Sequence, residues 1–341
     1  MSYPTLWTIG FIALFTGYLM LAGANYGVGS TLLVTARTDR ERRTVLGGLG
    51  PFLLGNEAWL LVSVGILVGT LPGLKTQLLV GAAPFALTAL SGALVLTSAV
   101  MLRSRHPDLA VRRRWDVAIC VAGIAAAFGW GGFLTAVAGG LDIDGEGHVT
   151  GSGASLSPVS LLGGLTAVAL FAAHGAAFTA ARTTGESAAR AARITGPLGA
   201  AGGALAAVTV IAGLAGGHFD GDALRRPWIA VFLIAAAGVA LFAAHRRMSG
   251  GSPWQSFAAT ATTVGLLPVA VFAAKYPYLV TPSDSGGTAA TAVQDLAADS
   301  TSLALITWTA GPVLLLVIAV QIRMWWLFRT TEERAAAPAF H

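Results

Sequence analysis

One carboxylate lies well inside a long apolar stretch of this sequence. Glu57 directly follows Asn56, and the residues three and four positions away from it on either side are all leucine. A carboxylic acid in the middle of a membrane costs about 2.5–3.5 kcal/mol on insertion scales. Because leucines cannot pair with it, another helix must supply a partner unless the carboxyl group is protonated. Glu57 is either a proton-relay or substrate-site carboxyl, or a protonated packing group close to the end of its segment.

Two other polar residues in apolar stretches are candidates for a buried polar site. His174 is the only histidine deep within such a stretch, and it either bonds across helices or transfers protons. Asn25 lies between Gly23 and Gly29 in a glycine-rich segment that permits close packing or a local break. A haem held by two histidines needs a second one at similar depth, and no set of His, Cys, Asp and Glu has metal-ligand spacing. The sequence therefore predicts no catalytic residue, no metal site and no cofactor bound by this chain.

The composition is that of a membrane protein. Of the 341 residues, 55% are hydrophobic and 11% are charged, and the mean hydropathy is +0.71. Soluble domains carry about 25% charged residues, so these values exclude a soluble enzyme and a disordered chain. The single cysteine, Cys120, excludes a secreted scaffold held by intrachain disulfides.

Nine apolar runs are each long enough to cross about 30 Å of hydrocarbon as a helix. They fall at residues 6–35, 52–71, 77–102, 117–139, 159–181, 195–215, 228–244, 256–274 and 303–327. The predicted fold is an all-α polytopic membrane protein with one membrane domain over residues 1–341, arranged as two four-helix bundles plus one extra helix. Residues 6–139 and 159–274 are candidates for parallel repeats, followed by the final helix at 303–327. Residues 276–302 form the longest loop, which is predicted to be extracytoplasmic.

The basic residues indicate the orientation of these helices, because cytoplasmic loops are enriched in Lys and Arg. Four of the 21 Lys and Arg residues fall on the side assigned to the outside: Lys75, Arg225, Arg226 and Lys275. The others fall on the side assigned to the cytoplasm: Arg37, Arg40, Arg42, Arg43, Arg103, Arg105, Arg112, Arg113, Arg114, Arg182, Arg190, Arg193, Arg246, Arg247, Arg323, Arg329 and Arg334. This asymmetry predicts an N-terminus outside and a C-terminus in the cytoplasm. The same residues account for the basic isoelectric point of about 9.9, so this value is no sign of nucleic-acid binding.

The residues alone leave two classes of function open. One is a subunit of a membrane redox or proton-handling complex. The other is a secondary transporter, in which helices should be interrupted at matching positions of two halves. Only the first apolar run is clearly interrupted by glycines, which favours the complex subunit.

Five motifs in chain order resemble subunit II of the cytochrome bd-type quinol oxidases, and the resemblance covers nearly the whole chain. The motifs are Gly23-Ala24-Asn25-Tyr26-Gly27-Val28-Gly29, Pro51 with Gly55-Asn56-Glu57-Ala58-Trp59-Leu60, Phe171-Ala172-Ala173-His174-Gly175-Ala176, Tyr276-Pro277-Tyr278-Leu279-Val280-Thr281-Pro282-Ser283, and Gln321-Ile322-Arg323-Met324-Trp325-Trp326-Leu327-Phe328-Arg329. The resemblance implies a complex in the bacterial cytoplasmic membrane that oxidises quinol and reduces oxygen to water. It places the b- and d-type haems and the quinol site mainly in subunit I.

The resemblance also implies the partners of the chain and its own role. The partners are the haem-bearing subunit I, membrane lipid and quinone, with a small single-helix subunit as a further candidate. Subunit II supplies a scaffold and, through acidic residues, a proton route from the cytoplasm. The candidates for this route or for a buried polar site are Glu57, Asn56, Asn25 and His174.

Several acidic positions of the family pattern are replaced in this sequence. The acid before the first glycine is Ala22, and the following Asp is Asn25. The Trp-Asp pair of the second motif is Leu53-Leu54, and an Arg and an acid near the end of the third run are Leu96 and Met101. Asn hydrogen-bonds but does not exchange a proton at neutral pH. The chain is therefore either a divergent paralogue with only a scaffold role, or a subunit of a complex whose proton route runs elsewhere.

Overall fold

The computed structural model describes residues 2–144, 146–219, 224–283 and 290–327. In these ranges the chain forms ten α-helices and a short 3-10 turn at Ala154–Leu156. The helices are α1 (Tyr3–Thr35), α2 (Asp39–Thr70), α3 (Pro72–Gly81), α4 (Ala83–Arg103), α5 (Leu109–Gly139), α6 (Pro158–Arg182), α7 (Gly185–Ala215), α8 (Pro227–Ser249), α9 (Pro253–Lys275) and α10 (Ser300–Leu327). All of them except α3 are long and apolar enough to cross a membrane. The predicted all-α architecture with nine membrane-spanning helices is thus confirmed for the described residues.

Several helices begin before the apolar runs that predicted them, because polar first turns extend them. α2 begins at Asp39 rather than at residue 52, and Thr38 caps it: its hydroxyl oxygen accepts a hydrogen bond from the Glu41 backbone N–H at 3.2 Å. The Glu41 carboxylate accepts in return from the backbone N–H of Thr38 at 3.1 Å, which completes a capping box. A search for apolar runs alone cannot find such turns.

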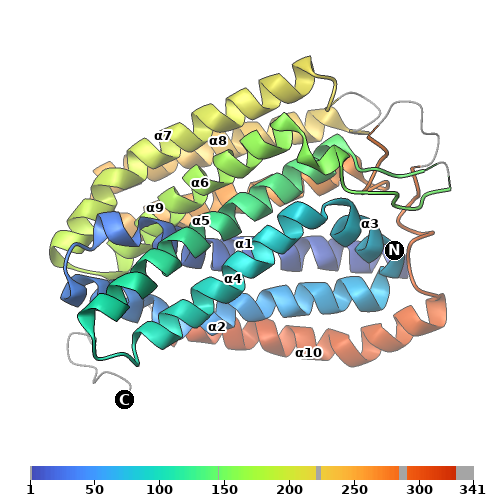
Figure 1. The fold of residues 1–341 in the computed structure, drawn as a ribbon. Coiled ribbons are helices and arrows are strands. Elements are labelled where there is room, and N and C mark those ends of the chain that lie inside the picture. Colours follow the sequence, from blue (N-terminus) through green and yellow to red (C-terminus); the bar gives the residue numbers. More distant parts are fainter. Residues whose placement is uncertain (1, 145, 220–223, 284–289, 328–341) are drawn as a thin grey trace.

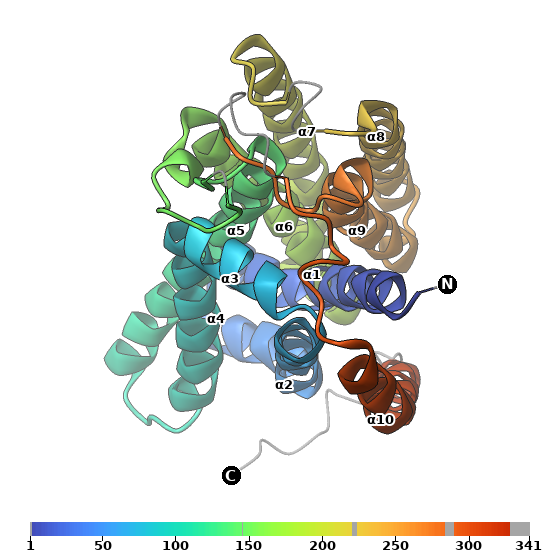
Figure 2. The ribbon, with the colours of Figure 1, turned by 90° about the vertical axis from the view of Figure 1, so that its right-hand side faces the viewer.

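The predicted helix at 77–102 is in fact two helices, α3 and α4, which are separated at Ala82. Pro84 lies in the first turn of α4, where its missing N–H would be unpaired in any case. Proline therefore favours a new helix start at this point over a continuous helix. α3 is a short helix that lies across one end of the bundle (Figure 2).

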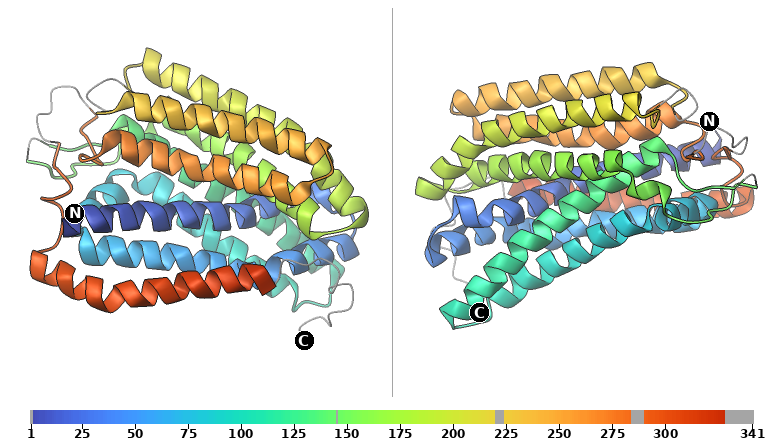
Figure 3. Two further views of the ribbon diagram at one scale, coloured as in Figure 1. Left: turned by 180° about the vertical axis from the view of Figure 1, so that it is seen from behind. Right: turned by 45° about the horizontal axis from the view of Figure 1, so that its top comes forward.

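The helices pack as two groups with one additional helix. α1, α2, α4 and α5 form the first group, and α6, α7, α8 and α9 form the second. α1 and α5 both pack on α6 and so join the groups, while α10 lies beside α2 (Figures 1 and 2). Figure 3 shows that α1 lies between the α6–α9 group and the α2–α10 pair. The internal repeat suggested by residues 6–139 and 159–274 stays a prediction.

α1 and α6 approach each other so closely that only glycine fits between them. A Cβ atom on Gly27 would lie 2.6 Å from the backbone nitrogen of Gly175, and closer still to the carbonyl oxygen of Phe171. Real Cβ atoms do not come this near to backbone atoms. The contact holds the middle of α1 at a fixed depth and distance against the second group, which matters because α1 carries the fully buried side chains of Tyr18, Asn25 and Tyr26.

The ends of the bundle differ in charge. The α1–α2, α4–α5, α6–α7 and α8–α9 connections lie together at one end, opposite to the start of α1 (Figures 1 and 3), and these connections and the helix turns next to them carry most of the basic residues. Which end faces the cytoplasm stays a prediction. Arg329 and Arg334, as well as residues 284–289 of the long loop, lie outside the described residues.

Candidate functional site

Glu57 obtains its hydrogen-bond partners from α1, since its own helix offers only leucines. The side-chain amide of Asn25 donates to one carboxylate oxygen of Glu57 at 3.2 Å, and the Tyr26 hydroxyl donates to the other at 3.1 Å. Asn25 and Tyr26 are both fully buried, whereas Glu57 is only partly buried. Two consecutive residues of one helix therefore bind both oxygens of the carboxyl group.

A chain of side-chain amides leads to Glu57 from α10. The Gln321 amide of α10 donates to the Asn56 side-chain oxygen at 3.2 Å. The Asn56 amide in turn donates to the Asn25 side-chain oxygen at 3.0 Å and to the backbone carbonyl of Leu21 at 2.9 Å. Because Asn25 then donates to Glu57, three amides form one continuous branch across α10, α2 and α1. We call this the amide branch.

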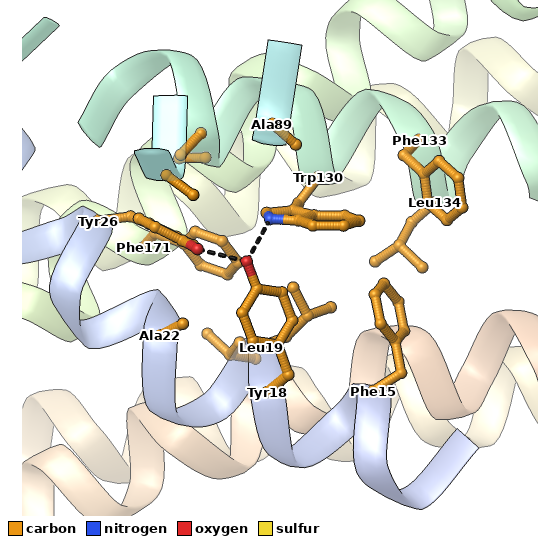
Figure 4. Packing of buried hydrophobic residues seen from close by; sticks show 14 of the residues in the cluster. Phe15, Tyr18, Leu19, Ala22, Tyr26, Ala89, Trp130, Phe133, Leu134 and Phe171 are labelled. Carbon is orange, nitrogen blue, oxygen red and sulfur yellow. Dashed lines mark hydrogen bonds between the residues drawn. The ribbon is translucent and has the colours of Figure 1, made fainter. Parts of the chain in front are cut away.

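A second branch reaches Glu57 through aromatic side chains. The Trp130 indole of α5 donates to the Tyr18 hydroxyl at 3.1 Å, and the hydroxyls of Tyr18 and Tyr26 are hydrogen-bonded to each other. Figure 4 shows these three side chains meeting between α1 and α5. The Tyr18 and Trp130 rings also pack edge to face, with centroids 5.4 Å apart. We call this the aromatic branch.

The direction of the hydrogen bonds in the aromatic branch follows from its two ends. An indole N–H only donates, so the Tyr18 oxygen accepts from Trp130. Tyr26 donates its single hydroxyl hydrogen to Glu57, so the bond between the tyrosines has Tyr18 as donor. Along the path from Gln321 to Glu57 and the path from Trp130 to Glu57, each donor thus gives its hydrogen to an acceptor that lies nearer to Glu57. The arrangement can stabilise negative charge on this carboxylate and hold it in one orientation.

His174 takes no part in either branch. Its Nε2 atom is hydrogen-bonded to the backbone carbonyl of Met20 at 2.9 Å, and its Nδ1 atom to the Thr260 hydroxyl at 2.8 Å. The ring also stacks on Phe257 with centroids 4.7 Å apart and an angle of 7° between the planes. Both ring nitrogens are engaged and one ring face is covered, so this fully buried histidine does not fit the role of a haem ligand.

Metal binding by the described part of the chain finds no support in its donor groups. No three His, Cys, Asp or Glu side chains come together there in a way that could hold a metal ion. Among the described residues, His174, whose two ring nitrogens are both hydrogen-bonded, does not fit as an axial ligand of the haems that the family resemblance implies.

A second polar cluster lies at the basic end of the bundle and was not predicted. Arg103 and Asp116 are 2% and 1% exposed and form a buried ion pair. Arg42 bonds Asp116 at 3.1 Å, and Arg103 also bonds Asp39 at 2.8 Å. In the sequence these arginines indicate only orientation, because most of their acidic partners are far away along the chain. The signal for the cluster is the presence of two aspartates within or next to arginine-rich turns.

The sequence also contained signals for the missed members of the two branches. Tyr26 adjoins Asn25, and Tyr18 precedes Tyr26 by about two helical turns. Gln321 is a lone amide within the last apolar run. What sequence could not show is that Trp130 of another helix reaches Tyr18.

Comparison with known proteins gives the family. The family described as "Cytochrome bd terminal oxidase subunit II" matches residues 3–328. The chain is 27% identical over 335 residues to "Cytochrome bd ubiquinol oxidase subunit 2" of Bacillus subtilis, with 96% of each chain covered. It is also 27% identical over 192 residues to "Cytochrome bd-I ubiquinol oxidase subunit 2" of Escherichia coli K12, which covers 53% of this chain and 49% of the relative.

A solved structure supports the same fold. The bd oxidase structure from Geobacillus thermodenitrificans aligns with a TM-score of 0.68 over 96% of this chain and 99% of that chain, at 18% identity. The resemblance seen in the five sequence motifs is confirmed by these matches. The chain belongs to the cytochrome bd terminal oxidase subunit II family.

Proposed function

We propose that this chain is subunit II of a quinol oxidase complex of the bacterial cytoplasmic membrane. The observation that carries the proposal is the family match over almost the whole chain, together with a curated ubiquinol oxidase relative that matches end to end. In this proposal a partner subunit I binds the haems and quinol, and the complex transfers electrons from quinol to oxygen. The engaged ring nitrogens of His174 support this division of labour.

Within the complex, we propose that Glu57 is a proton-carrying group and that the rest of the chain is a scaffold. Glu57 is the member of the network that is only partly buried, and Leu54 and Leu61, which flank it on α2, are exposed. Residues three and four positions apart share a helix face. A partner packed on this face of α2 would therefore contact the Glu57 carboxyl, which makes proton exchange with the partner feasible.

Asn25 supports a route with one carboxylate in place of two. The resemblance expects Asp at this position, and the Asn25 amide lies 3.2 Å from a Glu57 oxygen. Two carboxyl groups at such a distance cannot both ionise, so they would share a proton. With Asn25 the neighbour is a neutral donor, and the amide branch keeps its continuity. The proposal is therefore an oxidase subunit with a modified proton group, and no observation favours a transporter.

The proposal is tested by purifying the tagged chain from bacterial membranes together with whatever remains bound. We expect a larger haem-bearing subunit to co-purify and the reduced-minus-oxidised spectrum to show b- and d-type haems. The same chain expressed without the partner should give no stoichiometric haem spectrum. Haem bound by the isolated chain, or a purified complex without any haem, would contradict the proposal.

A further inference from the structure

A groove of about 390 Å³ opens at the basic end of the bundle. It lies between the α1–α2 connection and the first turns of α5, and we call it the basic groove. Three arginines line it, namely Arg37, Arg42 and Arg113, together with the carboxylates Asp39 and Asp116. The groove is separate from the network around Glu57 and has no part in the function proposed above.

The charges around the basic groove do not balance. Four arginines share the two carboxylates: Arg42 and Arg103 bond Asp116, while Arg43, Arg103 and Arg112 bond Asp39. This network alone holds two more positive than negative charges. Because Arg103 is 2% exposed and Arg42 is 14% exposed, much of this charge is withdrawn from water. Positive charge held in this way calls for an anionic partner.

Arg37 and Arg113 add to the excess. Both side chains are exposed, and neither forms an ion pair with any carboxylate in the described part of the chain. Because the two carboxylates of the groove are already ion-paired, the groove offers no free negative group to a cation. The ligand that matches this charge pattern is a phosphate, which arginine binds through paired N–H donors.

Apolar side chains directly beside these arginines indicate a phosphate that carries acyl chains. Val117 and Val121 follow Arg113 at intervals of four residues on α5 and so share its helix face. They are 47% and 60% exposed. Val34 in the last turn of α1 is 57% exposed, and Arg37 follows three residues later in the α1–α2 connection. α5 thus presents an arginine at the end of an exposed apolar face, and an exposed valine ends α1 shortly before Arg37, as a lipid with its phosphate at the membrane surface requires.

We propose that the basic groove is a binding site for an anionic phospholipid. Its phosphate lies among Arg37, Arg42 and Arg113, and an acyl chain lies along Val34 and Val117. A zwitterionic lipid is disfavoured, because its ammonium group would enter a region of excess positive charge in which Asp39 and Asp116 are already ion-paired.

The test uses the purified complex in detergent micelles. Phosphatidylglycerol, phosphatidylcholine and glycerol 3-phosphate are titrated separately, and bound lipid is counted by native mass spectrometry while the thermal midpoint is followed. The variant is the double substitution Arg37→Gln/Arg113→Gln. The matched control is Arg246→Gln/Arg247→Gln in the last turn of α8, where both arginines are exposed and the charge change is the same.

We expect tight binding of one phosphatidylglycerol and no comparable effect of the other two compounds. Each arginine near an anionic lipid surface contributes a favourable free energy of binding. Loss of two arginines should therefore weaken phosphatidylglycerol binding about thirtyfold, and loss of one about fivefold. The control should bind as the unmodified chain does. If the double variant does not accumulate, the single Arg113→Gln variant provides the same comparison.

Three results would overturn the proposal. The first is unchanged phosphatidylglycerol binding in the double variant, and the second is an equal loss in the control, which would indicate a general effect of surface charge. The third is equal stabilisation by glycerol 3-phosphate, which would show a site for free phosphate and not for lipid.

Discussion

Replacing Glu57 with Gln tests whether turnover depends on the exchangeable proton of this side chain or only on its shape. Gln keeps the length and the hydrogen-bonding capacity of Glu but has no proton to exchange at neutral pH. Proton transfer by a positioned side chain contributes about 10²–10⁴-fold to the rate of a reaction. If Glu57 carries protons for turnover, Glu57→Gln should therefore lower the oxygen-reduction rate about a hundredfold or more while the complex still assembles.

The structural cost of the same substitution follows from the direction of the hydrogen bonds. If the new oxygen accepts from Asn25, the new NH₂ group faces Tyr26 and donates to it. Tyr26 must then donate to Tyr18, which already accepts from Trp130, and the Tyr18 hydrogen loses its acceptor. One lost hydrogen bond corresponds to about 1 kcal/mol of stability. The variant should therefore lose a little thermal stability and almost all of its turnover.

The assay measures quinol-dependent oxygen consumption at equal haem content, with the thermal midpoint recorded in parallel. Glu186→Gln is the matched control, because Glu186 is an exposed carboxylate at the start of α7 that lies 3.5 Å from Arg190. The control should keep full activity. Full oxidase activity of Glu57→Gln at normal haem content would refute the relay role and leave a scaffold function for the chain.

Three further predictions concern the scaffold. Gly27→Ala should abolish accumulation of the chain in membranes, because its Cβ meets the α6 backbone, whereas Gly47→Ala, which has open space around it, should accumulate normally on an immunoblot. Asp116→Asn should lower the free energy of unfolding by about 3–5 kcal/mol, because Arg42 and Arg103 both lose their charged partner and Arg103 is as deeply buried as Asp116. An unchanged thermal midpoint would contradict this. The Asp299 carboxylate caps the start of α10, because it accepts hydrogen bonds from the hydroxyl and the backbone N–H of Ser302. These bonds hold the pKa of Asp299 below its ordinary value. The cap therefore stabilises the start of α10 at pH values above the unfolded pKa, and this stabilisation is lost as the pH falls through the lowered folded pKa. Hydrogen exchange in the first turn of α10 should accordingly accelerate at acid pH in the unmodified chain but show no such step in Asp299→Ala.

The helical architecture was predictable because a membrane imposes a simple rule on sequence. In a helical membrane protein the spanning segments are long apolar helices, so hydropathy alone predicted the nine membrane-length helices that the described residues form. Helix starts were less predictable, since the capping box at Thr38 and Glu41 extends α2 through polar residues. The proline in the first turn of α4 divided a run that looks continuous in hydropathy.

The polar network was predictable only in part, for a physical reason. Glu57 stands out in sequence because a lone acid among leucines is costly, and that cost requires a partner on another helix. Which partner it finds depends on the register between α1 and α2, and no periodicity of a single segment encodes that. Asn25 was singled out for its glycine-rich surroundings, but its contact with Glu57, and the contribution of Gln321 from α10, arise from packing between helices.

The indole that ends the aromatic branch has a consequence for energy conservation. An uninterrupted chain of hydrogen-bonded hydroxyl groups across a bilayer would conduct protons and dissipate the transmembrane proton gradient. Trp130 has a hydrogen to donate but no lone pair with which to accept one, so proton hopping stops there. α5 continues for nine residues beyond Trp130, up to Gly139, so roughly 14 Å of helix separate the branch from that end of the bundle. If Glu57 carries protons as proposed, the hydrogen-bonded path from Glu57 through Tyr26 and Tyr18 therefore ends at Trp130.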